Sequence, residues 1–156
     1  MGRYVVGKPQ RRTRIPARGR AEWTGDLKGG TGSFTAGDTG IGGEYSFHSR
    51  FEDGSGANPE QLIAAAHAAC FSMALSGRLA NAGSPPESVT TDAVVTLRRT
   101  DDGPTIYTIA LTTVGTVPGM DEATFKEHAE EAKKGCPVSR ALAAVPEITV
   151  EASLAS

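Results

Sequence analysis

The sequence predicts an α+β fold, because segments of strand type and of helix type follow one another in separate runs. Short β-type segments divided by glycine-rich turns come first, and a long apolar helical stretch follows them. Two long β-type segments, an amphipathic helix and an alternating C-terminal segment complete the order. Strict alternation of strand and helix, which indicates a parallel α/β sheet, is absent. With 156 residues, the chain can bury one sizeable core.

The N-terminal β-type segments predict a meander of short strands, at residues 19–24, 32–36 and 44–51. A helix is predicted over residues 59–82. Asn58 is its N-cap, Pro59 suits its first position, and Gln61 can complete a capping box. Gly83 and the two prolines that follow it end the helix. Because it is apolar on nearly every side, we expect it to be central and buried.

The second half of the chain predicts a hairpin, two helices and a final strand. The hairpin strands are 88–99 and 105–117, joined by the turn-forming sequence DDGP. An amphipathic helix is predicted from Asp121 to residue 134, and a short helix over 137–144. Residues 148–154 alternate between apolar and polar side chains, which is typical of a half-buried strand.

Charge divides the chain into a basic N-terminal extension, residues 1–18, and a single domain, residues 19–156. Seven basic residues and no acidic residue lie in positions 1–20, whereas 18 acidic residues lie beyond them. Prolines and glycines favour a flexible, solvated tail over a nucleic-acid contact. We expect no membrane-spanning run and no secretory signal, so the predicted compartment is the cytoplasm. A cytoplasmic disulfide is usually transient and catalytic.

The two cysteines are the candidate reactive groups. Cys70 lies inside the apolar helix, where burial opposes ionisation, so holding it as a thiolate takes about 2.7 kcal/mol plus the burial penalty. Only a close cation supplies a shift of that size. Arg50, on the predicted strand before the helix, is the best candidate, and Arg78 is less suitable. Cys136 lies at the start of the last short helix, where unpaired N–H groups favour an anion.

Glu60 is a further candidate with a geometric restriction. It precedes Cys70 by ten residues on the predicted helix, which separates the two by about 15 Å along the axis. Glu60 therefore serves the Cys70 site only from a second copy of the chain or through Arg50. The simpler alternative is that its carboxylate complements the positive end of the helix dipole.

Other interpretations of these residues remain open at this level. His67, Cys70, His128 and Cys136 form a possible zinc set, although their spacing includes no close ligand pair with a knuckle. A Cys–His hydrolase with His67 as base is also conceivable, but no oxyanion motif is evident. A non-catalytic ligand-binding domain would hold both cysteines in its core.

Several runs of the sequence closely resemble the osmotically inducible protein C branch of the OsmC/Ohr hydroperoxide-resistance family. They are YSFHSRFED (45–53), NPEQL (58–62), AHAACFSMAL (66–75), VPGMD (117–121) and GCPVS (135–139). The resemblance covers residue 19 to the C-terminus. It implies antiparallel sheets packed around two main helices in an intertwined homodimer. Because Arg50 lies twenty residues before Cys70, the chain resembles this branch rather than the Ohr branch.

The resemblance also implies a thiol-dependent peroxidase that acts in oxidative and osmotic stress defence. It makes Cys70 the peroxidatic cysteine, Cys136 the resolving cysteine, and Arg50 and Glu60 the polar pair around the thiolate. It implies organic hydroperoxides as substrates, with hydrogen peroxide as a further one, an external thiol or dithiol reductant and no bound cofactor or metal. We expect an apolar approach that includes Phe71 and Met73.

Overall fold

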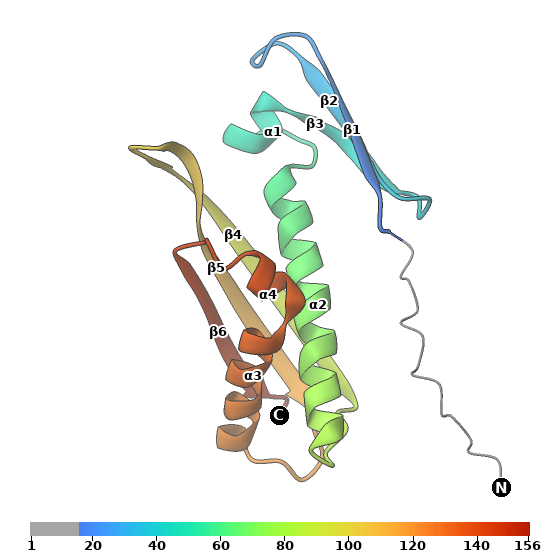
Figure 1. Cartoon of the computed structure of the whole chain (residues 1–156), viewed down its shortest axis with the longest axis vertical. Helices are drawn as coiled ribbons and strands as arrows, with labels where there is room; N and C mark the ends of the chain where they lie inside the picture. Colours follow the sequence, from blue (N-terminus) through green and yellow to red (C-terminus); the bar gives the residue numbers. More distant parts are fainter. Residues whose placement is uncertain (1–15) are drawn as a thin grey trace, which may run out of the picture. The chain divides into compact units, whose positions relative to one another are not determined.

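The computed structural model describes residues 16–156, and it confirms the predicted α+β class (Figure 1). The chain divides into two compact units, one ending at Ala57 and the other running from Asn58 to Ser156. Residues 1–15 of the predicted basic extension lie outside the described residues, and a single domain from 19 to 156 stays a prediction.

The first unit is the predicted meander. β1 (Gly19–Thr24), β2 (Thr31–Ala36) and β3 (Ile41–Ser46) pair antiparallel in that order. The rings of Trp23 and Tyr45 lie 5.5 Å apart on one face. Gly32 makes this packing possible, because a Cβ at that position would lie 2.6 Å from the Tyr45 ring.

The predicted strand over residues 44–51 is wrong in its second half. The strand ends at Ser46, and α1 (Phe47–Phe51) follows it. Ser46 and Ser49 form a reciprocal capping box, in which each backbone N–H donates to the hydroxyl of the other residue. Arg50 therefore lies on a short helix and not on a strand.

The second unit begins with α2 (Pro59–Asn81), which matches the predicted helix. Asn58 is its N-cap, and its side chain accepts a hydrogen bond from the backbone N–H of Gln61 at 2.9 Å. The Gln61 side chain accepts the Asn58 N–H in return, so the predicted capping box is confirmed. The chain leaves the helix at Gly83, which has a positive φ of 86°.

The sheet of this unit contains β4 (Ser88–Thr100), β5 (Gly103–Thr116) and β6 (Glu147–Leu154), in that order. β4 and β5 form the predicted antiparallel hairpin. β6 departs from the expected antiparallel sheets, because it pairs parallel to β5. The chain reaches β6 through α3 (Glu122–Gly135) and α4 (Pro137–Ala141), and a parallel neighbour requires such a crossover.

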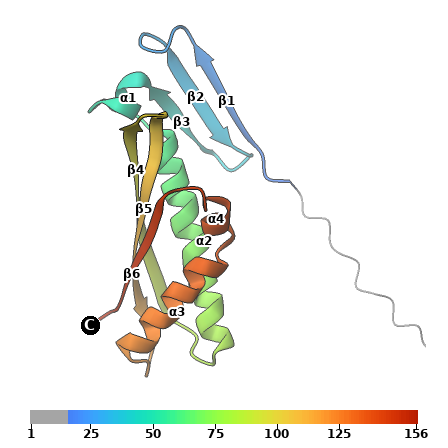
Figure 2. The same ribbon diagram turned by 60° about the vertical axis from the view of Figure 1, so that its left-hand side comes forward.

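The core lies between one face of this sheet and the helices, as Figure 2 shows for α2, α3 and α4. The buried hydrophobic residues come from α2, β5, α3 and the segments that flank them. They are Phe71, Leu75, Leu79, Ile109, Leu111, Val117, Phe125, Ala129, Ala132 and Cys136. Polar groups also join the layers, since the Ser72 hydroxyl on α2 donates to Thr91 on β4 at 2.8 Å.

The opposite side of α2 is exposed in the single chain, contrary to the expectation of a helix buried all round. Met73 is 78% exposed and Leu62 is 38% exposed. The sequence analysis predicts no membrane-spanning run, but α2 is long and apolar enough to cross a membrane by length and composition. The core helix of a soluble protein passes the same test.

Gly115 on β5 provides a test of this packing. An added Cβ would lie 2.5 Å from the buried Phe125 ring, so Gly115→Ala should destabilise the fold by about 1–3 kcal/mol. Urea unfolding at fixed protein concentration measures this change. Gly135→Ala is the control, because nothing lies within 4 Å of its added Cβ. Equal midpoints for Gly115→Ala and the unsubstituted protein would show that β5 and α3 do not pack this closely.

Candidate active site

The structure brings the two cysteines together in the second unit. The Sγ atoms of Cys70 and Cys136 lie 3.4 Å apart, in hydrogen-bond contact, although 66 positions separate them in the chain. Both are free thiols. A disulfide has an S–S distance of about 2.05 Å, so the two sulfurs need to approach by only about 1.3 Å to form one.

A break between two helices places Cys136 against α2. A proline disfavours the α conformation at the residue before it. Cys136, which precedes Pro137, accordingly has an extended backbone with φ −61° and ψ 122°. Its N–H donates to the carbonyl of Ala132, which ends α3, and its carbonyl accepts the N–H of Arg140, which begins α4. α4 also packs on α2. The Cys136 side chain, completely buried, therefore points into the core and meets Cys70.

The surroundings of the two sulfurs favour different protonation states. Burial raises the pKa of Cys70, a backbone hydrogen bond from Val138 opposes this rise, and the neighbouring Cys136 adds to it. Burial also raises the pKa of Cys136, but the polar groups of Ser139 beside it and the neighbouring Cys70 outweigh this rise. The pKa of Cys136 is lowered as a result, in the opposite direction to that of Cys70.

Ser139 and His67 extend the site beyond the cysteines. His67, which is completely buried, has its Nε2 2.7 Å from the Ser139 hydroxyl oxygen. Burial lowers the pKa of His67 and so keeps the imidazole neutral. The sequence analysis identified His67 as a candidate residue but did not identify Ser139. Its position three residues after a cysteine at a helix start was the available signal, because that spacing returns a side chain to the same helical turn.

Arg50 and Glu60 lie in different units, Arg50 in the unit that ends at Ala57 and Glu60 in the unit that begins at Asn58. The Arg50 guanidinium lies over the Phe51 ring, 5.2 Å from its centroid. Glu60 is buried in the first turn of α2. Glu60 and Cys70 are on one unbroken helix, so the separation of about 15 Å along the axis holds. The roles predicted for Arg50 and Glu60 stay predictions.

Two alternative interpretations of the site lose support. No group of three or more His, Cys, Asp or Glu residues that could hold a metal ion occurs within residues 16–156, which include all four proposed zinc ligands. The hydrolase interpretation needs His67 as the base for Cys70, but Nε2 of His67 is hydrogen-bonded to the hydroxyl of Ser139. Phe71, expected along the substrate approach, is completely buried in the core and cannot line it.

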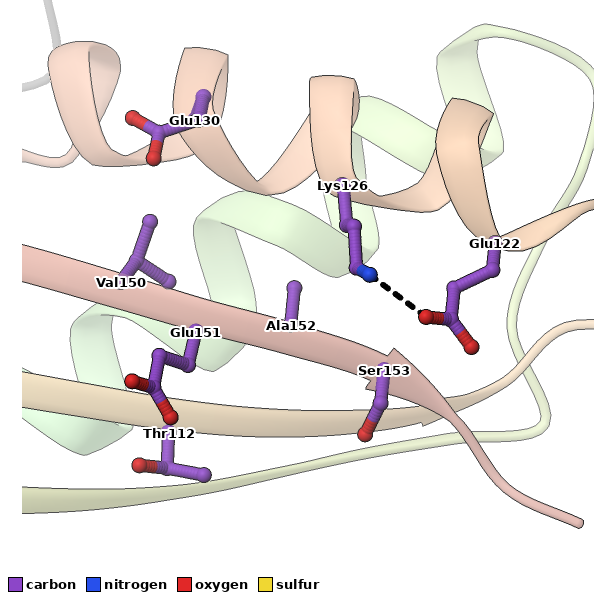
Figure 3. Close-up of a pocket in the computed structure, with 8 residues that line it drawn as sticks. All are labelled: Thr112, Glu122, Lys126, Glu130, Val150, Glu151, Ala152 and Ser153. Atoms are coloured by element: carbon purple, nitrogen blue, oxygen red, sulfur yellow. Dashed lines mark hydrogen bonds and ion pairs between the residues drawn. The ribbon is translucent and has the colours of Figure 1, made fainter.

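A surface groove between α3 and β6 lies apart from these residues. Figure 3 shows its lining, which includes the ion pair of Lys126 with Glu122 at 2.6 Å. Neither cysteine lines this groove. We therefore assign the candidate site to the cysteine pair.

Two free thiols in contact on an α+β scaffold define a dithiol protein. The family model described as OsmC-like protein matches residues 52–151. Peroxiredoxin OsmC of Escherichia coli (strain K12) is 47% identical over 144 residues, which cover 91% of this chain and 99% of that protein. The chain belongs to the OsmC-like protein family. An organic hydroperoxide resistance protein of Xanthomonas axonopodis pv. citri is 36% identical over 56% of this chain and 61% of that protein.

Solved structures agree with the fold. An organic hydroperoxide resistance protein OsmC from Legionella pneumophila superposes with a TM-score of 0.68 at 23% identity, over 92% of this chain and 100% of that one. An OsmC-like protein from Mycoplasma pneumoniae gives a TM-score of 0.68 at 16% identity, over 91% and 99% of the two chains. At these identities the likeness shows the fold alone.

The short distance between the sulfurs predicts that the disulfide forms without unfolding. Diamide should oxidise the reduced protein to a form with a Cys70–Cys136 disulfide within each chain and none between chains, because the two sulfurs are already in contact. Intact mass spectrometry would detect the loss of two hydrogens, and circular dichroism should stay unchanged. Cys136→Ser is the control that cannot form this bond. Predominant cross-linking between chains would contradict the prediction.

Proposed function

We propose that the chain is a thiol-dependent peroxidase that reduces organic hydroperoxides, through a Cys70 sulfenic acid and a Cys70–Cys136 disulfide. The observation that supports this most is the contact of two free sulfurs at 3.4 Å. The names of the relatives, a peroxiredoxin and an organic hydroperoxide resistance protein, favour the same chemistry in stress defence. The match to the OsmC-like family model, residues 52–151, includes both cysteines.

In the first step, the Cys70 thiolate attacks the terminal oxygen of the hydroperoxide. The O–O bond breaks, an S–O bond forms, and the alcohol leaves after gaining a proton. Because burial raises the pKa of Cys70, this step needs a cation that favours the charge on that sulfur. Arg50 has this role in the proposal, and its guanidinium also donates to the oxygen on which charge develops. Glu60 orients the guanidinium through a bidentate contact.

In the second step, Cys136 attacks the sulfur of the sulfenic acid. The S–S bond forms, the S–O bond breaks, and hydroxide leaves as water after gaining a proton. An external thiol or dithiol then reduces the disulfide and completes the cycle. The reaction is carried by sulfur and requires no bound cofactor. A reducing compartment such as the cytoplasm suits a disulfide of this transient kind.

We also propose that the active unit is a homodimer. The exposed side of α2 presents an apolar surface formed by Leu62, Ala65, Ala66, Ala69, Met73 and Gly77. A second copy of the chain would cover this surface. It would also solve the problem of reach for Glu60, which lies too far along α2 to contact its own Cys70.

Replacing each cysteine separates the two chemical steps. Cys70→Ser should reduce peroxide turnover to background, because no attacking sulfur remains. Cys136→Ser should consume one equivalent of cumene hydroperoxide and accumulate a sulfenic acid. Stopped-flow peroxide consumption and dimedone trapping measure these outcomes. Undiminished turnover by Cys70→Ser would exclude the proposed mechanism.

Replacing Arg50 tests the activation of Cys70. Arg50→Ala should slow sulfenic acid formation at neutral pH by about tenfold or more, because the raised pKa of Cys70 then lacks its counter-charge. The thiolate is the reacting form, so the rate of this variant should recover as the pH rises through that pKa. Arg78→Ala, which removes an exposed arginine from α2, is the control. Equal rates and equal pH profiles for Arg50→Ala and the control would assign the activation to another group.

A further inference from the structure

The two sulfurs of the site differ in their access to solvent. Cys136 is completely buried, whereas Cys70 is partly exposed, although their Sγ atoms lie only 3.4 Å apart. Residues three or four positions apart share one surface of a helix, so Cys70 on α2 adjoins Ala66 and Met73. Both of these residues are exposed in the single chain, as is Ala69 beside Cys70. Cys70 therefore lies at the edge of an exposed surface, and Cys136 lies in the core.

The short helix α4 keeps Cys136 away from solvent. It begins directly after Cys136 and packs on α2, and its Val138 packs against the same core as Cys136. Buried side chains of the two helices also form a hydrogen bond, since Nε2 of His67 lies 2.7 Å from the hydroxyl oxygen of Ser139. Nδ1 of His67 has no hydrogen-bond partner within residues 16–156, so separating α4 from α2 would leave the ring with none. Because buried polar groups resist the loss of a partner, α4 stays packed beside Cys136.

The proposed peroxidase reaction requires an opening to Cys70, because the hydroperoxide must reach that sulfur. Forming the disulfide brings the two sulfurs closer by only about 1.3 Å, so Cys136 stays buried in the oxidised protein. A second copy of the chain on the exposed side of α2 would cover further atoms and would not expose Cys136. An external thiolate can therefore use the opening that admits the hydroperoxide, and this opening leads to Cys70.

We propose that the reductant attacks the disulfide at Cys70 and that Cys136 is the leaving sulfur, because α4, held on α2 by the His67–Ser139 hydrogen bond, shields Cys136. This proposal rests on the peroxidase function proposed above and gives the direction of its last step. His67 and Ser139 act in it as positioning residues, because they hold α4 in place and contact neither the peroxide nor the reductant.

The step is balanced through a mixed disulfide. The thiolate of the reductant forms an S–S bond with Cys70, the Cys70–Cys136 bond breaks, and Cys136 leaves as a thiolate that gains a proton. The second thiol of a dithiol, or a second monothiol, then attacks the reductant sulfur and releases Cys70, so the reductant loses the two electrons that the protein gains. The pKa shifts agree with this direction. Burial raises the pKa of Cys70 while that of Cys136 is lowered, and the thiol with the lower pKa leaves faster.

The first test locates the mixed disulfide. The Cys70–Cys136 disulfide is made with diamide, so this test needs no peroxide. The oxidised protein is mixed with excess mercaptoethanol and quenched in acid before the reduction is complete, and mass spectrometry of its peptides identifies the cysteine that carries the adduct. The adduct on Cys70 should exceed that on Cys136 by about tenfold or more. Equal amounts on the two cysteines, or an excess on Cys136, would overturn the proposal.

The second test measures whether the His67–Ser139 hydrogen bond shields Cys136. In a Cys70→Ser background, Cys136 is the single thiol, and its reaction with dithionitrobenzoate under native conditions reports how often α4 opens. Ser139→Ala should speed this reaction by about fivefold, because α4 loses a hydrogen bond to α2. Ser139→Thr keeps the hydroxyl and should react at the rate of the background. Ser72→Ala is the matched control, because it removes a hydroxyl of α2 that bonds to Thr91 on β4 and not to α4.

The same substitution should change the site of attack in the two-cysteine protein. With α4 opening more often, Ser139→Ala should raise the share of the mercaptoethanol adduct found on Cys136, whereas Ser72→Ala should leave the share unchanged. Because this readout compares two sulfurs of one folded chain, a uniform loss of stability would not produce it.

An unchanged adduct share in Ser139→Ala, with a Cys136 reaction rate equal to that of Ser72→Ala, would overturn the role of the His67–Ser139 hydrogen bond. Failure of the peroxidase function itself would look different. Cumene hydroperoxide would then leave both thiols of the unsubstituted protein intact, while the disulfide made with diamide would still show which sulfur a thiol attacks.

Discussion

The contact between α4 and α2 is the constraint on which the chemistry of this protein depends. Cys136 follows the last residue of α3 and precedes Pro137, so the α3 helix ends there. The next helix, α4, packs back on α2. This break buries Cys136 beside Cys70. α2 and α3 rest on the sheet through core residues such as Phe71 and Phe125, so the position of the sulfurs depends on the same packing that stabilises the fold.

The two sulfurs share a site but have opposite electrostatic requirements. Burial disfavours charge on Cys70, whereas Ser139 favours it on Cys136. A peroxidase needs the charge on Cys70 for the first step and on Cys136 for the second. In the proposed function, Arg50 supplies the first preference. The order of the two steps then follows from which sulfur has already been oxidised, and the fold need not rearrange between them.

Much of the fold could be predicted from local sequence signals. Asn58, Pro59 and Gln61 form a complete helix start within four residues, and the structure has the helix that they predict. Residues 44–51 are predicted as one strand of the meander, but the spacing of four between Phe47 and Phe51 suits a helix, and the Ser46–Ser49 capping box decides for the helix. The parallel pairing of β6 could not be predicted, because no local signal records which strand a segment will join across a crossover. The contact of Ser139 with His67 could not be predicted either, because the two residues are 72 positions apart.

Counting thiols tests the central claim, that Cys70 and Cys136 act as one redox pair, most directly. The fully reduced protein is mixed with one equivalent of cumene hydroperoxide, and the free thiols are titrated under denaturing conditions. The contact at 3.4 Å predicts that both thiols disappear together and return with dithiothreitol. Persistence of both thiols, as in a binding domain whose cysteines are only core residues, would contradict the claim.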